Sequence, residues 1–326
     1  MSELNLPKND VQLVEKLKSS YTDIKNEISK VIVGQDEIIS NILISIFSKG
    51  HSLLVGVPGL AKTLLVKTIA DVLDLKFSRI QFTPDLMPGD ITGTEIIEED
   101  QATKRRNFRF IKGPVFANII LADEINRTPP KTQSALLEAM QEQKVTAAGV
   151  TYNLDKPFFV LATQNPIEQE GTYPLPEAQL DRFMFNLWLD YPSFTEEVEI
   201  IKSTTSEYQP ELNKVISTDE IIEFQSLIRR VPVADNVIEY AVKVVQNSRS
   251  AEFKDVISWG AGPRASQYLI LAAKTKSVLE GRFTPSIDDV KYSLVPVLRH
   301  RIIPSFNAEA EGINSVEIIK RISEKI

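Results

Sequence analysis

Apolar residues recur at two different spacings along the first part of the chain. Residues 9–31 place apolar side chains three or four positions apart, which is the spacing of one helix face, and a second stretch of this kind follows Gln35. Residues 52–55 then form a short apolar run between two glycines, which predicts a buried strand. Residues 64–73 return to helical spacing. The pattern therefore predicts two helices, a strand and a third helix.

Further short apolar runs continue this alternation. They lie at 77–82, 118–122, 158–162 and 185–189. Helical stretches separate several of these runs, and strands that alternate with helices are typical of an α/β fold with a parallel sheet. One intervening helix has a clear start, because Thr128 suits its N-cap and Pro129 its first helical position.

Two insertions have the pattern of β-hairpins. Residues 93–112 carry two apolar-flanked runs across a polar, charged tip, and residues 144–159 carry two short runs on either side of Gly149. The basic run Lys104–Arg106 lies on the first hairpin, and we favour a solvated tip over a contact surface for it.

Strand signals fade from about Pro192 onward, and helical spacing dominates. The segments with this spacing are 195–207, 218–230, 234–248, 264–280 and 286–299. A chain of 326 residues also suits two domains at roughly 100–200 residues each. We therefore expect an αβα domain over residues 1–191, with an N-terminal helix and the two hairpins, and an all-α domain over residues 192–326.

Composition excludes several classes of protein. The chain has no cysteine, which rules out disulfides, zinc ribbons, iron–sulfur clusters and thiol catalysis. His51 and His300 are its two histidines, too few for a multi-histidine metal site. The net charge of −7 gives no overall attraction to nucleic acid. No apolar run approaches the length of a membrane span and no secretory signal is visible, so we expect a soluble, cytoplasmic protein.

The strongest local motif lies between the predicted strand at 52–55 and the helix that follows it. Glycines let backbone N–H groups of such a loop surround a phosphate, Lys62 can reach the β- and γ-phosphates, and the Thr63 hydroxyl can bind Mg²⁺. One position departs from the usual pattern, because Ala61 replaces the glycine before the lysine. The residues that we expect to bind the nucleotide here are Gly56, Val57, Pro58, Gly59, Leu60, Ala61, Lys62, Thr63 and Leu64.

A second motif places two carboxylates at the end of a predicted buried strand. Asp123 and Glu124 follow the run 118–122. Behind a phosphate loop, Asp123 is expected to hold Mg²⁺ through water and Glu124 to polarise the attacking water. By itself the pair could also be a helix N-cap followed by a solvated acid.

Three further polar residues occupy notable positions. Asn165 follows the strand at 158–162, on the sheet edge where ligands of parallel sheets bind. Its amide could orient a water there. The alternative is that Asn165 only forms an Asn-Pro turn. Arg182 precedes the strand at 185–189, and Arg264 enters a helix of the second domain. Taken alone, each arginine suits a surface ion pair better than a catalytic role.

Taken together, these motifs resemble the MoxR family of AAA+ ATPases, in the clade with a helix-2 insert. The resemblance covers residues from about 31 to 299. The segments that carry it are 33–35, 56–63, 121–127, 134–142, 162–166, 180–183 and 262–266. The hairpin at 93–112 is similar to the helix-2 insert of that clade, and the hairpin at 144–159 to its pre-sensor hairpin.

The resemblance implies specific roles at matching positions. Val33, Gly34 and Gln35 would line the adenine pocket. Asn165 would be sensor 1. Arg264 would be sensor 2, carried by the helical lid onto the γ-phosphate, and Arg182 would be the arginine finger that reaches the ATP of a neighbouring subunit.

The resemblance also implies a type of activity. Its members are ring-forming ATPases, typically hexamers, that use ATP and Mg²⁺ to mature or assemble partner proteins, often with a separate protein that has a von Willebrand factor A domain. Three alternatives remain: a nucleic-acid motor or loader, the ATPase subunit of a magnesium chelatase, and a nucleotide-binding scaffold without turnover. The joint presence of Lys62, Asp123, Glu124 and Arg182 disfavours the scaffold, and the acidic net charge makes us favour protein clients over nucleic acid.

Overall fold

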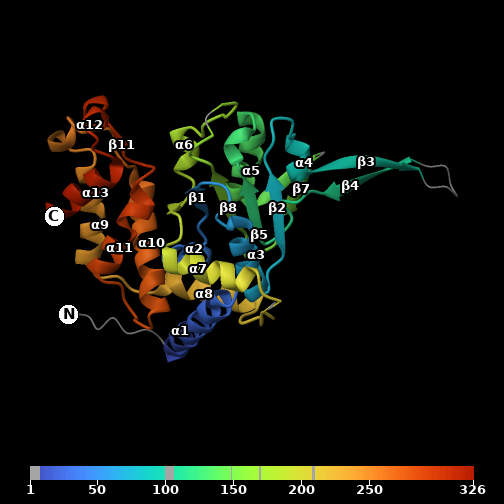
Figure 1. Cartoon of the computed structure of the whole chain (residues 1–326), viewed down its shortest axis with the longest axis horizontal. Helices are drawn as coiled ribbons and strands as arrows, with labels where there is room; N and C mark the ends of the chain where they lie inside the picture. The colour runs from blue at the N-terminus through green and yellow to red at the C-terminus, as the bar shows by residue number, and fades with distance from the viewer. Residues whose placement is uncertain (1–7, 100–105, 148, 169, 208–209) are drawn as a thin grey trace.

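The computed structural model describes residues 8–99, 106–147, 149–168, 170–207 and 210–326. Its centre is a sheet of five parallel strands, arranged in the order β2-β5-β8-β1-β9 (Figure 1). These strands are β1 (Ser52–Gly56), β2 (Phe77–Gln81), β5 (Ile119–Asp123), β8 (Phe159–Gln164) and β9 (Phe185–Leu189). The predicted α/β fold with a parallel sheet is confirmed.

Side chains that alternate along these strands build a separate hydrophobic cluster on each face of the sheet. Leu54 and Leu161 belong to one cluster, and their neighbours Leu53 and Val160 belong to the other. The helices that contribute to the first cluster include α1 (Lys8–Ser29), α2 (Asp36–Phe47) and α3 (Lys62–Val72). The second face is covered by α5 (Pro130–Glu142). Both faces of the sheet are therefore buried, as continuous apolar strands require.

Helix α5 begins one residue later than the sequence predicts. Pro129 is its N-cap and Pro130 its first residue. Thr128, the predicted cap, instead donates its hydroxyl hydrogen to the Thr83 carbonyl, 3.1 Å away. The prediction of the cap was wrong because two prolines follow each other, and the second one also suits the first helical position.

Two hairpins extend from this core, as predicted. The first hairpin is long and projects from the body (Figure 1). It pairs β3 (Gly93–Glu99) with β4 (Arg106–Lys112). The short helix α4 (Pro88–Thr92) comes directly before β3. Cross-strand ion pairs join Arg106 to Glu99 and Arg109 to Glu98. The second hairpin pairs β6 (Lys144–Ala147) with β7 (Val150–Asn153). Lys104 and Arg105 of the basic run lie outside the described residues.

The C-terminal part is helical except for one short pairing of strands. Its helices are α7 (Phe194–Thr204), α8 (Thr218–Arg230), α9 (Asp235–Asn247), α10 (Pro263–Leu279), α11 (Ile287–Leu298), α12 (Phe306–Ala310) and α13 (Ser315–Glu324). The strands β10 (Ile257–Trp259) and β11 (Ile303–Pro304) pair antiparallel and were not predicted. Their two or three residues are too few to show a periodicity in the sequence.

The hydrophobic cluster on the α1–α3 face of the sheet continues into these C-terminal helices. Phe47 of α2 meets Phe224 of α8 edge to face, with 6.3 Å between ring centroids, and α10 contacts α1 and α2. A domain boundary between residues 191 and 192 stays a prediction. Among the described residues, no helix is both long and apolar enough to cross a membrane.

Candidate nucleotide-binding site

The glycine-rich loop joins the carboxyl end of β1 to the first residue of α3. Gly59 has φ +88°, and Ala61, the N-cap of α3, has φ 52°. Both values lie in the left-handed region, which glycine enters freely and alanine enters at a cost of about 1 kcal/mol. This conformation explains why glycine is usual before the lysine of a phosphate loop. Ala61 adopts this conformation as the N-cap of α3.

Lys62 folds back over this loop. Its Nζ donates a hydrogen bond to the Gly56 carbonyl at 2.6 Å. Burial lowers the pKa of the Lys62 ammonium, while the nearby charges of Asp123 and Glu124 act in the opposite direction. The loop, the lysine and the two carboxylates therefore form one electrostatic unit.

Asp123 ends β5 with both carboxylate oxygens engaged. Oδ1 accepts a hydrogen bond from the Thr163 hydroxyl at 2.6 Å, and Oδ2 pairs with Arg79 Nη2 at 2.7 Å. Its side chain is 13% exposed. Neither partner was identified from the sequence. Thr163 becomes visible as a partner only when β8 is known to lie beside β5, and Arg79 only when β2 is known to lie on the other side.

Glu124 has an unusual backbone conformation, with φ 58° and ψ 49°. Its N–H donates to the Thr163 hydroxyl oxygen at 2.8 Å, and its Oε2 accepts from Gln81 Nε2 at 3.1 Å. Arg127 Nε lies 3.1 Å from the same Oε2. A left-handed non-glycine residue persists only where its surroundings hold it, and it is typical of functional positions. Gln81, Arg127 and Thr163 therefore fix the Glu124 carboxylate at the edge of the sheet.

Asn165 follows β8 on the same edge of the sheet. Its side chain is 7% exposed, and its Oδ1 accepts a hydrogen bond from Ile167 N at 3.2 Å. Because β5, β8 and β1 are adjacent and parallel, their carboxyl ends bring Asp123, Asn165 and the loop after Gly56 together. The structure thus assembles the predicted loop, acidic pair and amide in one place.

The two predicted arginines lie at the opposite edge of the sheet. Arg182 comes shortly before the amino end of β9 and donates from Nη1 to the Leu137 carbonyl at 2.8 Å. Arg264 pairs with Asp181 through a 2.8 Å contact. Since β9 runs parallel to β1, whose carboxyl end carries the loop, both arginines stand away from their own loop. Arg264 contacts Asp181 in this structure, and its expected role as sensor 2 stays a prediction.

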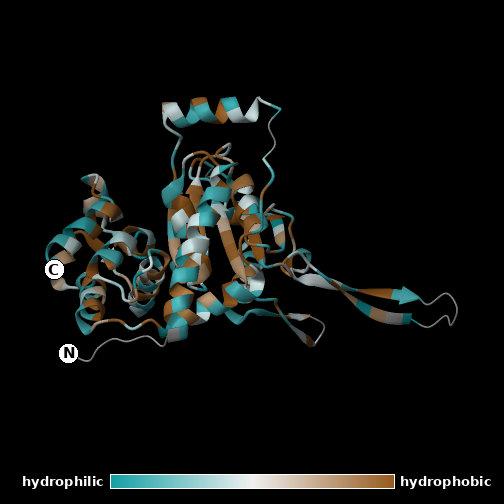
Figure 2. Cartoon of the chain, turned by 90° about the horizontal axis from the view of Figure 1, so that it is seen from below, coloured by the Kyte–Doolittle hydropathy of each residue, from teal (hydrophilic) through white to brown (hydrophobic). Residues whose placement is uncertain are grey.

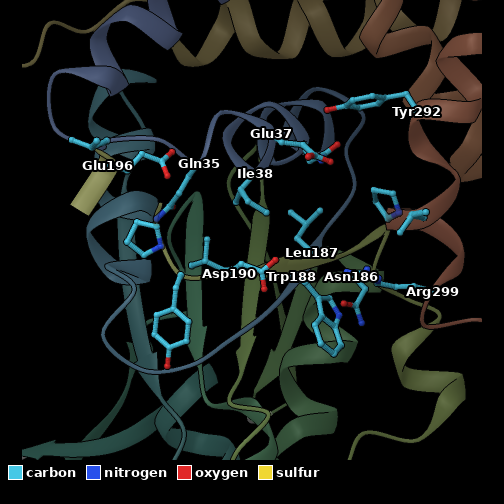
Figure 3. A pocket seen from close by; sticks show the side chains of 17 residues that line it. Gln35, Glu37, Ile38, Asn186, Leu187, Trp188, Asp190, Glu196, Tyr292 and Arg299 are labelled. Carbon is cyan, nitrogen blue, oxygen red and sulfur yellow. The ribbon is translucent and has the colours of Figure 1, made fainter. Parts of the chain in front are cut away.

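A cavity of about 510 Å³ lies beside β9, between α2 and α11 (Figure 3). Val33 and Gln35 line it, as the predicted adenine residues should. Three buried side-chain oxygens in its wall have no hydrogen-bond partner, namely Gln35 Oε1, Asn41 Oδ1 and Asn186 Oδ1. Amide oxygens left unpaired in a polar cavity suit a ligand that carries hydrogen-bond donors.

Gly34, the third predicted adenine residue, turns tightly beside α7. It has φ +68°, and a Cβ at this position would lie 2.1 Å from Glu196 Oε1. Only glycine therefore allows the first turn of α7 to approach the 33–35 segment this closely. The sequence resemblance marked the glycine but not its neighbour in α7.

The oxygen atoms at this site suit magnesium. Mg²⁺ prefers hard oxygen ligands and usually shares its coordination between one or two protein groups, phosphates and water. Thr63 supplies a hydroxyl next to Lys62, and Asp123 supplies a carboxylate near it. Across the described parts of the chain, no group of three or more His, Cys, Asp or Glu side chains forms a metal cage. The donors fit an ion held together with a nucleotide.

The geometry defines a P-loop nucleotide-binding protein with a helical C-terminal lid, and comparisons with known proteins agree. Residues 51–185 match the model of the ATPase family associated with various cellular activities, and residues 249–322 match that of the AAA lid domain. A crystal structure of a candidate ATPase from Cytophaga hutchinsonii superimposes with a TM-score of 0.89 and 42% identity, covering 97% of this chain and 96% of that one.

Two curated relatives are similar over nearly the whole chain. The chaperone MoxR1 of Mycobacterium tuberculosis is 45% identical over 92% of this chain and 80% of its own length. The protein YeaC of Bacillus subtilis is 43% identical over 92% of both chains. The protein MoxR of Methylorubrum extorquens is more distant, at 27% identity over 85% of this chain and 86% of its own length. The chain belongs to the MoxR family of AAA+ ATPases.

Proposed function

We propose that this chain binds ATP with Mg²⁺ at the carboxyl edge of its sheet and hydrolyses it within a ring of identical subunits, in order to remodel partner proteins. One observation carries the ATPase part: the phosphate loop, Asp123, Glu124 and Asn165 meet at the ends of three adjacent strands. The chaperone role rests on the similarity to MoxR1, which is described as a chaperone.

Each group at the carboxyl edge has a distinct task in this proposal. Lys62 exchanges the Gly56 carbonyl for the β- and γ-phosphates of ATP. Thr63 and Asp123 hold Mg²⁺, which would neutralise charge on the phosphates when bound. Glu124 accepts a proton from the attacking water, and Asn165 orients that water against the γ-phosphate. The unpaired amide oxygens around Gln35 and Asn41 accept hydrogen bonds from the adenine end of the nucleotide.

The arginines support an assembly in which a second copy completes the site. Arg182 and Arg264 stand at the amino edge of the sheet, and their own phosphate loop lies at the carboxyl edge. A head-to-tail contact between copies brings unlike edges together, and such contacts close into rings. We therefore propose that both arginines act on the nucleotide of the neighbouring subunit. For Arg264, this replaces an approach to its own nucleotide.

The experiment that tests the proposal compares Glu124→Gln with the parent chain. The variant should bind ATP with Mg²⁺ and fail to release phosphate, because an amide cannot accept the proton. Glu311→Gln, at an exposed position in the C-terminal part, is the matched control and should hydrolyse ATP at the parent rate. Parent-rate hydrolysis by Glu124→Gln would refute the catalytic assignment.

The same variant identifies what the protein acts on. Chains that hold ATP without cleaving it should retain their client in a pull-down, and a partner with a von Willebrand factor A domain should be recovered as a separate chain. Stimulation of ATP hydrolysis by DNA, with no protein retained, would instead favour a nucleic-acid motor.

A further inference from the structure

Helix α7 approaches the body at its first turn, where Glu196 lies beside Gly34, and is otherwise largely exposed. Two connecting segments join it to the body, and the helix lies outside both helical layers (Figure 2). None of its residues is buried. Helices of water-soluble folds are ordinarily stabilised by packing an apolar face, so an 11-residue helix in this position needs a partner for that face.

The outer face of α7 is apolar. Phe194, Val198 and Ile201 follow the i, i+4, i+7 spacing that places side chains on one side of a helix. Phe194 is 81% exposed and Ile201 is 55% exposed. Glu196, Val198 and Ile200 are half-buried. The two ends of the stripe, Phe194 and Ile201, are therefore its solvent-exposed part.

The helix as a whole is acidic, and one of its glutamates borders this stripe. The helix carries three glutamates, Glu196, Glu197 and Glu199, and one basic residue, Lys202. Glu196 caps the helix through Ser193, while Glu197 and Glu199 form no salt bridge to any described residue. Glu197 borders the apolar stripe on one side, because it lies three residues after Phe194 and four before Ile201, and Lys202 borders it on the other side, four residues after Val198. A matching partner surface is therefore an apolar groove with a basic group that faces Glu197.

A groove of this kind lies between the connection from α2 to β1 and the helices α8, α9 and α10. Its cavity has a volume of about 540 Å³, and its lining includes Ile238, Tyr268 and Leu271. Lys49, Arg229 and Arg264 are its charged lining residues, and no carboxylate lines it.

The positive charge of the groove is largely uncompensated. Arg264 pairs with Asp181, but Lys49 and Arg229 form no salt bridge within the described part of the chain. Burial together with the positive charges of Lys156 and Arg229 lowers the pKa of Lys49. A helix with an apolar face and a net negative charge would complement the apolar lining and the positive charges of this groove.

We propose that α7 of one copy docks into this basic groove of the next copy. The helix follows the carboxyl end of β9, whereas Ser48 and Lys49 of the groove precede the amino end of β1. Because the two surfaces flank opposite edges of one sheet, a chain cannot fill its own groove with its own helix. The contact is head to tail, and it deepens the proposed ring by assigning the segment that joins neighbouring subunits.

A charge-swap experiment tests this pairing. Glu197→Arg and Arg229→Glu should each weaken assembly of the purified full chain by about tenfold or more, measured by sedimentation with ATP and Mg²⁺, because each places like charges in the contact. An equal mixture of the two variants should assemble again, since alternating subunits then match at every interface. Failure of the mixture to assemble, when each variant alone is monomeric, would overturn the proposal.

Cross-linking gives an independent reading, because the chain has no cysteine of its own. A mixture of Ile201→Cys and Ile238→Cys chains should form a mixed dimer with a short thiol-reactive cross-linker. Ile201→Cys mixed with Ile326→Cys, another exposed position, should not do so. Equal yields in the two mixtures, or cross-linking of Ile201→Cys to itself alone, would overturn the proposal.

The outcome is separable from the ATPase proposal. Fluorescent-nucleotide binding reports on the Lys62 loop and should be unchanged in Glu197→Arg, whose α7 position is outside the loop. A parent chain that binds ATP and stays monomeric would overturn both the ring and this contact. A third outcome would overturn this contact alone. In that outcome Phe194→Glu and Arg229→Glu chains still assemble, and Arg229→Glu no longer binds an acidic peptide or an oligonucleotide that the parent chain binds. The groove would then serve another partner.

Discussion

The Thr163 hydroxyl donates a hydrogen bond to Asp123 Oδ1 across 2.6 Å. The same hydroxyl oxygen accepts the backbone N–H of Glu124 at 2.8 Å. One side chain on β8 thus orients the Asp123 carboxylate, which we propose binds Mg²⁺, and holds the left-handed backbone turn at Glu124. Thr163 is fully buried, so water cannot replace either bond.

Replacement of Thr163 by valine should therefore slow ATP hydrolysis by about tenfold or more, because valine keeps the shape and loses both hydrogen bonds. Thr163→Ser keeps the hydroxyl and should restore most of the rate. Steady-state phosphate release with saturating ATP measures both. A valine variant with the parent kcat would show that Asp123 and Glu124 need no such support.

Removal of the loop lysine should abolish nucleotide binding. Lys62→Ala takes away the ammonium that we expect on the β- and γ-phosphates, and it also removes the hydrogen bond to Gly56. Isothermal titration with ATP and Mg²⁺ should detect no binding, while circular dichroism remains that of the parent. Lys67→Ala, one turn further along α3, is the control and should bind ATP normally.

Mixed rings should show that the arginines act between subunits. Arg182→Ala and Glu124→Gln should each be inactive alone, since an arginine finger contributes ~10³–10⁵ in turnover. In an equal mixture, an Arg182→Ala subunit keeps its own Glu124 and receives the finger of a Glu124→Gln neighbour. Random assembly with independent sites restores up to about a quarter of the interfaces. Full activity of Arg182→Ala alone would reduce this arginine to its hydrogen bond with Leu137.

A second mixture of this kind shows whether Arg264 acts on the nucleotide of its own subunit or on that of the neighbouring subunit. Arg264→Ala subunits mixed with Glu124→Gln subunits should regain activity if Arg264 reaches the neighbouring site. They should stay inactive if Arg264 closes onto its own nucleotide, because the only subunit with an intact Glu124 then lacks its arginine. The Asp181 contact of Arg264 in this structure favours recovery.

His51 should make the fold sensitive to acid. Its Nδ1 accepts from Val160 N at 3.0 Å, and burial lowers the pKa of the ring from 6.5 to about 4. A lowered folded-state pKa favours the neutral ring, so its stabilisation is present above pH 6.5 and is lost as the pH falls toward 4. The shift corresponds to about 3 kcal/mol. Urea titrations at pH 7.5 and pH 4.5 measure the free energy of unfolding. Between these two pH values it should fall more for the parent than for His51→Gln. An equal fall in both would contradict the lowered pKa of His51.

Arg301 should contribute more to stability than any exposed arginine. It is 5% exposed and donates to Asp181 Oδ1 at 2.8 Å and to the Phe183 carbonyl at 2.7 Å. Arg301→Leu should lower the free energy of unfolding by about 3 kcal/mol, because it removes a buried guanidinium and leaves the Asp181 carboxylate and the Phe183 carbonyl without these hydrogen bonds. The control Arg321→Leu breaks only an exposed pair with Glu317 and should cost less than about 1 kcal/mol.

The sequence predicted the elements of the core better than their mutual contacts. The parallel strands, the phosphate loop and the Asp123–Glu124 pair follow from local patterns, because a buried strand and a tight glycine turn each leave a local signal. Arg79, Gln81 and Thr163 were missed, since their roles depend on which strands are neighbours. The contact of Arg264 with Asp181 was also not predicted, because a motif at the start of a helix does not reveal which residues that helix approaches.

The placement of Glu124 and Arg182 at opposite edges of the sheet also has a genetic consequence. A chain with a defective Arg182 still has an intact Glu124 at its carboxyl edge. In the proposed ring it can occupy a position and inactivate only the ATP site of the neighbouring subunit that needs its arginine. In the proposed ring, two alleles damaged at different edges should therefore partly compensate for one another, whereas two alleles damaged at the same edge should not.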